Sequence, residues 1–413
     1  MAQSESETVL TEHHETDNLD PRTDAPARPG TPVHIAPVQL GNITVPTPVV
    51  LSPMAGVTNW PFRVICEEYG PDGLYVAEMI TARALVAHNP KALRLCHFAK
   101  SEKIRSLQLY GVNPSITEQA AQIVVDGNMA DHVDLNFGCP VPKVTRRGGG
   151  SALPWKTDIF TELLQRVVAV CEPAGIPVTA KIRVASTITM RPSSKPDTSR
   201  RRRLQGRNPA CPYHRRILWR SFRLVPHRRA QGTPQRSGIR QWRYLGCRGC
   251  ARNGARDRLR RCGHRPRMPG PAVAVRQHQK RLRGQSRTAQ PESGEVCRVI
   301  HRHAELLTEF YEGDEMMAVH DLRKHIAWYL KGFPVGGSTR KAFMECESLS
   351  DVDREIGKLD PTIEYPPRVV DKPRGRVRFA KKVHLPYGWL ESRTTTHEER
   401  EALFGDDPMD ASY

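Results

Sequence analysis

The chain has 413 residues, a mean hydropathy of −0.54 and 38% hydrophobic residues, which allows two or three domains with substantial polar sequence between them. We find no apolar run long enough to span a bilayer and no apolar signal segment near the N-terminus, so we expect a cytoplasmic protein. Ten cysteines in a chain of this length do not indicate a disulfide-stabilised scaffold.

The formal net charge of +19 suggests nucleic-acid binding, but its distribution is uneven. Residues 186–290 carry 29 Lys+Arg against 2 Asp+Glu, and 27 of these 29 cations are Arg. The rest of the chain carries 34 basic and 42 acidic residues. One segment therefore supplies the whole positive balance and has to be explained before the charge is interpreted.

Residues 1–32 are polar and rich in proline towards their end, and we expect a disordered tail there. Five apolar, β-branched runs then predict strands, and helix-length segments separate them. This spacing favours a parallel α/β fold. Further amphipathic segments predict four helices near the C-terminus, and residues 360–413 form a mixed-charge tail. The predicted strands are 47–54, 73–79, 104–110, 132–135 and 176–183, and the predicted C-terminal helices are 294–311, 316–329, 339–347 and 349–359.

Residues 131–155 place polar and thiol side chains just after a predicted buried strand, where α/β enzymes put their chemistry. Asn136 ends the strand and Cys139 follows it, Lys143 and Arg146 offer cationic donors, and a glycine triplet at 148–150 allows close approach to a ligand. Each feature also has a plain structural interpretation. A lone cysteine is more often a small buried hydrophobe, and a glycine triplet is more often a flexible turn.

Two further polar residues interrupt predicted strands. Gln108 and Lys181 lie inside otherwise apolar runs, and a buried amide or ammonium is costly without a partner. A bound ligand would supply that partner. For Gln108, a core amide satisfied by protein groups is about equally favoured by the sequence.

Taken together, the stretch closely resembles the D-x-N-x-G-C-P-x-x-K-V motif of the FMN-dependent tRNA-dihydrouridine synthases. The segment P-M-A-G-V-T-N-x-P-F-R resembles the first barrel strand and loop of the same family, although Asn59 stands where aspartate is usual. The resemblance extends over about residues 33–184 and 291–359, and the bacterial B-type enzymes are the most similar. The matching motif residues are Asp134, Asn136, Gly138, Cys139, Pro140, Lys143 and Val144.

The resemblance implies a TIM (β/α)8 barrel over 33–290 and a C-terminal helical, tRNA-binding domain over 291–359. It implies that NADPH reduces FMN, that a uridine of tRNA is flipped into the barrel, and that Cys139 donates a proton to C5 as hydride reaches C6. Asn136 would orient the uracil, with Lys143 and Arg146 near the substrate. The implied flavin contacts are Pro53, Met54, Ala55, Gln108 and Lys181. We expect a monomer without metal or membrane partners. The alternatives are a non-catalytic nucleic-acid-binding protein and a barrel resembling dihydroorotate dehydrogenase.

The arginine-rich segment breaks the α/β pattern, and three interpretations compete. It is a basic RNA-binding insert, a zinc module built on Cys247, Cys250, Cys262 and His264, or a stretch translated in a shifted reading frame. Back-translation with free codon choice, read one base later, gives VFGNGDIWAAED from Gly238–Cys250 and VIGRGCLGRPWLF from Gly263–Arg276. Both strings resemble the flavin-phosphate loops of the family in the expected order. We therefore hypothesise a frameshift over about 185–290 that disrupts the last three barrel units.

Overall fold

The computed structural model describes residues 37–183, 217–222, 262–263, 291–365 and 384–404, with backbone alone for the two short pieces. All of these residues belong to one compact unit, Pro32–Tyr413. The expected N-terminal tail lies outside the described residues. So do the proposed zinc ligands Cys247, Cys250 and His264, and all of the two shifted-frame stretches, Gly238–Cys250 and Gly263–Arg276, except Gly263.

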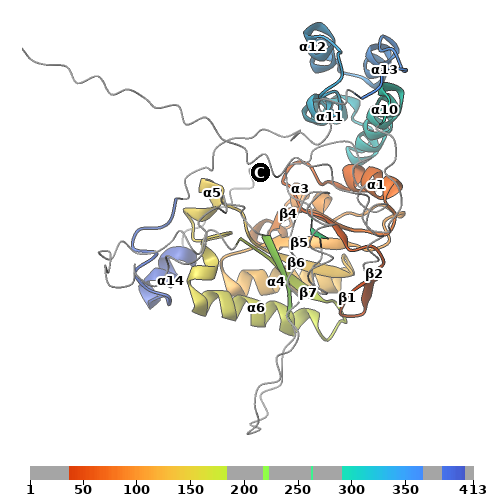
Figure 1. Cartoon of the computed structure of the whole chain (residues 1–413). Helices are drawn as coiled ribbons and strands as arrows, with labels where there is room; N and C mark the ends of the chain where they lie inside the picture. The colour runs from red at the N-terminus through yellow and green to blue at the C-terminus, as the bar shows by residue number, and fades with distance from the viewer. Residues whose placement is uncertain (1–36, 184–216, 223–261, 264–290, 366–383, 405–413) are drawn as a thin grey trace, which may run out of the picture. The chain divides into compact units, whose positions relative to one another are not determined.

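Five parallel strands follow one another across the sheet in chain order, which confirms the α/β class (Figure 1). Helical crossovers connect them, as expected for the first five units of an eight-stranded barrel. A separate antiparallel hairpin, β1 (Val38–Leu40) with β2 (Ile43–Val45), precedes them. The parallel strands are β3 (Val49–Leu51), β4 (Leu74–Thr81), β5 (Ser106–Tyr110), β6 (His132–Phe137) and β7 (Val178–Arg183).

The strands β5, β6 and β7 have two chemically different faces because side chains alternate along a strand. One face is apolar, and its Leu107, Val133 and Leu135 join a core with residues of the covering helices such as Val124 and Val167. The other face carries the buried polar side chains Ser106, Gln108, His132, Asp134, Asn136, Thr179 and Lys181. The predicted strands are thus confirmed, and their polar residues gather on one side of the sheet.

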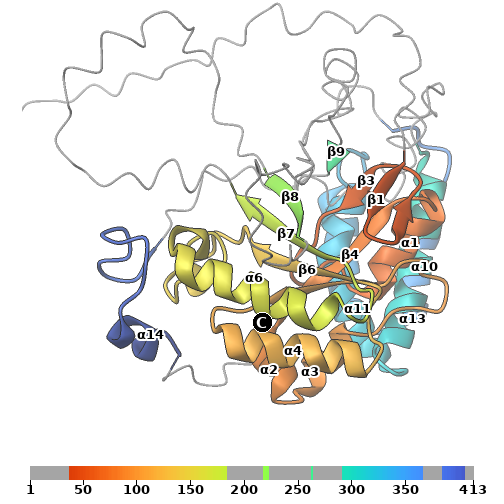
Figure 2. The ribbon, with the colours of Figure 1, turned by 90° about the horizontal axis from the view of Figure 1, so that it is seen from below.

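The crossover helices are α1 (Trp60–Tyr69), α2 (Ala82–Val86), α3 (Pro90–Leu95), α4 (Pro114–Asp126), α5 (Pro142–Thr145), the short 3-10 turn η2 (Leu153–Trp155) and α6 (Thr157–Cys171). Three of them begin with an asparagine side chain that accepts backbone N–H bonds and have proline at the first or second helical position, as in Asn113–Pro114. Helices α4 and α6 lie side by side over the sheet (Figure 2).

The parallel order stops after β7 within the described backbone. Strand β8 (Ile217–Phe222) pairs antiparallel to β7, whereas a sixth barrel strand would run parallel. At the other edge the two-residue strand β9 (Cys262–Gly263) pairs with β3 in parallel. The frameshift hypothesis stays a prediction, and an antiparallel neighbour of β7 is compatible with it.

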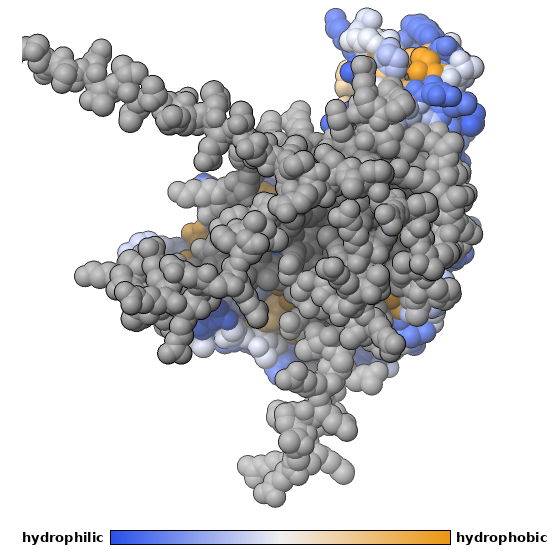
Figure 3. Space-filling model, in the orientation of Figure 1, coloured by the Kyte–Doolittle hydropathy of each residue, from blue (hydrophilic) through white to orange (hydrophobic). Residues whose placement is uncertain are grey.

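The C-terminal helices share a core with the first crossover helix. Helix α1 contributes Phe62 and Ile65 to a cluster that includes Ile300 and Leu307 of α10 and Ile326 of α11. The residues that α12 and α13 present in Figure 3 are mainly hydrophilic around one hydrophobic patch, as expected for amphipathic helices. The bounds are α10 (Ser293–Phe310), α11 (Glu315–Tyr329), α12 (Gly337–Glu345), α13 (Leu349–Gly357) and, further on, α14 (His397–Phe404).

Residues 384–404 differ from the poorly packed tail expected beyond residue 360. Trp389 is only 4% exposed, and the segment is hydrogen-bonded to η2 and α6. Composition missed this packing because one buried tryptophan among polar residues gives no periodic pattern. Among the described helices, none is both long enough and apolar enough to cross a membrane.

Candidate functional site

Cys139 lies just beyond the C-terminal end of β6, in a turn closed by a side chain. The Asn136 Oδ1 atom accepts hydrogen bonds from the backbone N–H groups of Gly138 (3.0 Å) and Cys139 (3.1 Å). Cys139 is half-buried, while the other free cysteines of the described chain are buried, and it packs beside Met79 and Tyr110. Of these cysteines, only Cys139 is partly exposed, and it lies at the C-terminal edge of the sheet.

The glycine triplet supports this turn from the other side. The Ser151 N–H donates to the Cys139 carbonyl at 2.9 Å. Gly150 has φ +54°, and a Cβ there would lie 2.5 Å from the same carbonyl oxygen and 3.1 Å from Cys139 Cβ. A side chain at this position would have to displace Cys139. The triplet is therefore a close backbone contact with the cysteine and more than a flexible turn.

A chain of hydrogen bonds fixes the amides behind Cys139. Because Asn136 Oδ1 is occupied by two backbone donors, its Nδ2 faces Gln108 Oε1 at 3.1 Å and Met79 Sδ at 2.9 Å. Gln108 must then direct its Nε2 at Asp134 Oδ2, 2.5 Å away. Gln108 thus has protein partners at both ends of its amide, and its contact with a flavin stays a prediction.

A second arm reaches the same carboxylate from the opposite side. The Thr179 hydroxyl donates to Asp134 Oδ1 at 2.6 Å, and His132 Nε2 lies 3.0 Å from the Thr179 oxygen. His132 Nδ1 is 2.7 Å from Ser106 Oγ. Burial lowers the pKa of His132 to about 4, so a neutral ring that donates from Nε2 and accepts at Nδ1 satisfies both contacts. The two arms therefore both end on Asp134, which accepts from Gln108 and from Thr179.

Lys181 completes the buried group and faces Asn136 across the β6–β7 pair. Burial lowers the pKa of its ammonium to about 8, while the Asp134 charge opposes that shift. Burial likewise raises the pKa of Asp134 to about 7, against the hydrogen bonds from Thr179 and Gln108 and the charge of Lys181. A Cβ at Gly138 would lie 3.8 Å from Lys181 Nζ, which places the ammonium beside the turn that carries Cys139.

The loop after β3 presents the other predicted flavin contacts. Pro53 and Met54 are half-buried and Ala55 is exposed, while the Met54 N–H and carbonyl are hydrogen-bonded within the loop itself. The loop is held by Thr58, whose Oγ1 accepts the Met54 N–H at 3.0 Å, and by Glu78. The Gly56 N–H donates to Glu78 Oε2 at 2.5 Å, and burial raises the pKa of that carboxyl above its ordinary value.

Asn59, the departure from the family motif, has a specific partner. Its Oδ1 caps α1 by accepting the Phe62 N–H at 3.3 Å, and its Nδ2 donates to Asp321 Oδ2 at 3.1 Å. An aspartate here would cap the helix equally well but would set two carboxylates against each other. The asparagine therefore connects α1 to α11 in this chain.

Lys143 and Arg146 are the predicted site residues that extend outward. Both are exposed, on α5 and at its C-terminal end, and the buried members are Gln108, Asn136 and Lys181. The basic run Arg323–His325 of α11 is largely engaged with the protein. His325 is 1% exposed, and Arg323 donates to the Cys346 carbonyl at 2.7 Å.

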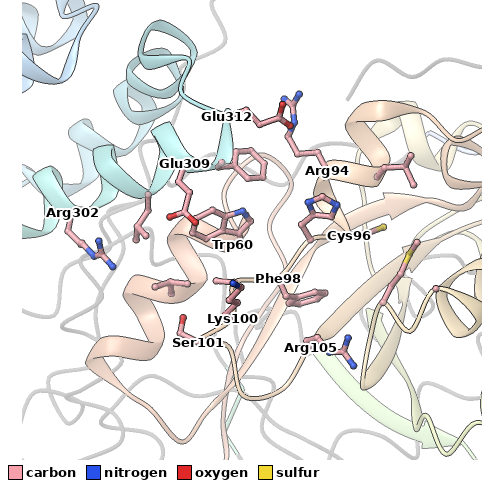
Figure 4. Close-up of a pocket in the computed structure, with 18 residues that line it drawn as sticks. Trp60, Arg94, Cys96, Phe98, Lys100, Ser101, Arg105, Arg302, Glu309 and Glu312 are labelled. Carbon is pink, nitrogen blue, oxygen red and sulfur yellow. The ribbon is translucent and has the colours of Figure 1, made fainter.

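A separate cavity of about 940 Å³ opens between α1, the loop after α3, and α10. Figure 4 shows Trp60 and Phe98 in it, with Arg94, Arg302, Glu309 and Glu312 among its charged residues. None of the sequence-predicted site residues lines this cavity. Within the described chain, no group of three His, Cys, Asp or Glu side chains is arranged to hold a metal ion.

Sequence reasoning gave no role to Asp134, although it is the acceptor on which the buried hydrogen bonds converge. The available signal was a carboxylate at an alternating position of a buried strand, two residues before Asn136. Thr179 and His132 were also missed, because either residue alone is common in a strand. Glu78 was missed in the same way, because it is a carboxylate within the apolar, buried strand β4.

Comparison with known proteins places this geometry in a family context. The family model described as "Dihydrouridine synthase (Dus)" matches residues 50–191. A "Probable tRNA-dihydrouridine synthase" of Mycobacterium tuberculosis is 35% identical over 373 residues, covering 86% of this chain and 92% of the relative. The protein of that name in Mycobacterium leprae is 35% identical over 384 residues, covering 83% and 95%. A "tRNA-dihydrouridine synthase B" of Pasteurella multocida is 28% identical over 335 residues, covering 78% and 95%.

Proposed function

This chain belongs to the tRNA-dihydrouridine synthase family, and from that premise we propose that it reduces the C5–C6 double bond of a uridine in tRNA, using FMN and NADPH. The observation that carries the proposal is the half-exposed Cys139 thiol, held between the Asn136 turn and the glycine triplet, beside a buried Lys181. The uracil must leave the RNA stack to reach it.

The residues at the C-terminal edge of the sheet suit a flavin. The Lys181 ammonium is buried beside the Cys139 turn, and the half-buried Pro53 and Met54 and the exposed Ala55 offer a partly exposed loop against which a planar ring would lie. A cation at this position suits the electron-rich edge of the ring. Gln108 would contact the flavin as well, with the direction of its amide set by Asn136 on one side and Asp134 on the other. When bound, reduced FMN supplies the hydride that reaches C6 of the uracil.

Cys139 acts as the general acid. As C6 receives hydride, the thiol proton passes to C5, which completes the reduction and leaves a thiolate that water reprotonates. General acid catalysis contributes about 10²–10⁴-fold to such a step. Asn136 holds the turn with its oxygen and gives its amide hydrogens to Gln108 and Met79, so we propose that it places Cys139 against the uracil edge.

Exposed cations and the C-terminal helices would hold the RNA. Lys143 and Arg146 extend from the loop after Cys139, where phosphates flanking a flipped uridine would lie. Lys331, exposed at the end of α11, offers a further contact on the helical side. We propose a monomer in which the helices from residue 291 form the tRNA-binding part.

The flavin phosphate is the critical point for this particular chain. Barrels of this kind hold a phosphate with glycine loops and a helix N-terminus after the last two strands. In this chain such loops exist only in the shifted reading of residues 185–290. We therefore expect a chain re-encoded in that frame to purify yellow and the chain as printed to purify colourless or insoluble. Stoichiometric FMN in the printed chain would contradict this account, and the nucleotide sequence tests the frameshift directly.

The catalytic role of Cys139 is tested in the re-encoded protein with Cys139→Ala. We expect FMN binding and NADPH oxidation to persist while dihydrouridine formation on unmodified tRNA, measured by mass spectrometry, falls by about 10²-fold or more. Cys171→Ala is the matched control, because Cys171 is a buried thiol on α6. Full turnover by the Cys139 variant would refute the role. Absence of flavin absorbance in every form would favour a non-catalytic RNA-binding protein instead.

A further inference from the structure

The segment 384–404, here called the C-terminal strap, is docked against the loop that follows Cys139. Trp389 is 4% exposed, and its Nε1 donates to the Ala152 carbonyl at 3.2 Å. Its ring lies directly on Gly148, where an added Cβ would come within 2.5 Å of the indole. Gly148 also has φ +73°, so this position excludes side chains for two independent reasons.

A buried cation shows that the strap is an integral part of the fold. Lys156, between η2 and α6, is fully buried. Its Nζ donates to the Thr394 carbonyl at 3.1 Å and to Glu399 at 3.3 Å, and lies 5.2 Å from the centre of the Trp389 ring. All three of these partners belong to the strap. An ammonium that is buried without such partners is costly, so the barrel sequence at Lys156 is suited to a docked strap.

Further contacts anchor the strap on the first two turns of α6. The Asp158 Oδ2 atom accepts from the Thr395 N–H at 2.8 Å and the Thr395 hydroxyl at 2.5 Å. Arg400 of α14 donates to Asp158 at 3.2 Å and to Glu162 at 2.8 Å. These bonds hold the C-terminal half of the strap, from Thr395 to Arg400, on α6, while Trp389 lies on the loop before that helix.

The loop beneath Trp389 is the one that supports Cys139. Gly148 and Ala152 touch the tryptophan, and between them Gly150 and Ser151 contact the Cys139 carbonyl. One layer of backbone therefore separates the strap from the proposed proton donor. The Asn136 turn holds Cys139 from the opposite side and is independent of the strap.

We propose that the C-terminal strap positions the Cys139 loop, with Trp389 as its central positioning residue, so that loss of the indole loosens the thiol without unfolding the barrel. The significance for catalysis rests on the proposed role of Cys139, but the positioning itself does not. Trp389 touches no reacting atom and acts through the backbone of residues 148–152.

The test is the rate of Cys139 alkylation by iodoacetamide in the full chain, followed by peptide mass mapping. In Trp389→Ala we expect that rate to rise about tenfold through local opening of the loop, while buried Cys171 labels at the wild-type rate. Trp389→Phe, which keeps a ring on Gly148, should restore most of the protection. The matched control is Tyr387→Ala, because Tyr387 is fully exposed in the same strap.

Unchanged Cys139 labelling in Trp389→Ala would overturn the proposal. A parallel rise at Cys171 would also overturn it, because it would indicate general unfolding instead of a local effect. The labelling needs neither flavin nor tRNA, so failure of the proposed enzymatic function leaves this result standing. In a flavin-loaded form, the positioning role further predicts a fall in kcat with little change in KM for tRNA, rescued by Trp389→Phe.

Discussion

Replacing Glu102 by glutamine should destabilise the protein strongly, because it leaves a buried guanidinium without its counterion. The Arg63 side chain is 1% exposed and that of Glu102 is 2% exposed. Their two contacts, Nε–Oε1 at 2.6 Å and Nη2–Oε2 at 3.0 Å, form a bidentate pair. Arg63 Nη1 also donates to the Thr58 carbonyl at 2.8 Å, so the pair supports the loop that holds Met54.

The size of the effect follows from burial. Removing one partner of a buried ion pair costs about 3–5 kcal/mol, because the remaining charge stays uncompensated. That is a large part of a typical stability of about 5–15 kcal/mol. The exposed ion pair between Arg105 and Asp131 provides a matched control. Arg105 and Asp131 are paired at 2.6 Å but are 31% and 37% exposed, so Asp131→Asn should cost only about 0–1 kcal/mol.

The assay is urea unfolding followed by circular dichroism, with the wild type, Glu102→Gln and Asp131→Asn compared at the same pH and salt concentration. A larger loss for Glu102→Gln, with an unchanged slope against urea, is the expected result. The double variant Arg63→Met/Glu102→Leu should recover much of the loss, since it removes both charges. Equal losses for Glu102→Gln and Asp131→Asn would show that burial does not control the cost, and the reasoning would fail.

Two further predictions concern buried titratable groups. Burial lowers the pKa of His303 to about 3 and that of His325 well below its ordinary value, so the unfolded chain binds protons that the folded chain does not. The free energy of unfolding should therefore be retained above about pH 6.5 and fall by about 2 kcal/mol per histidine between pH 7 and 5. His325→Phe should reduce this dependence on pH, measured by urea unfolding at several pH values. An unchanged dependence on pH in the variant would contradict the prediction. Asp134→Asn removes the anion beside Lys181, so the pH midpoint of Lys181 labelling by an amine reagent, read by peptide mapping, should shift downward, and an unmoved or raised midpoint would exclude that pairing.

The sequence by itself determined the five parallel strands, the four C-terminal helices after residue 291 and the position of the candidate site. The apolar runs at 104–110, 132–135 and 176–183 fold as strands because their period of two gives one face to the helices. Gln108, Asn136 and Lys181 fall on the opposite face of the same strands, and parallel strands end at the same edge, so the structure brings them together.

Only the tertiary structure decided the partners of these residues. The direction of the Gln108 amide depends on two backbone N–H groups after Asn136, which no local pattern encodes. His325, in the basic run Arg323–His325, is core because α11 turns its ring towards Phe62 of α1. Lys156 and Glu399 are separated by 243 positions along the chain, and their pairing depends on where the strap packs. Periodicity reports which side of an element is buried, whereas a buried polar contact depends on the arrangement of several elements at once.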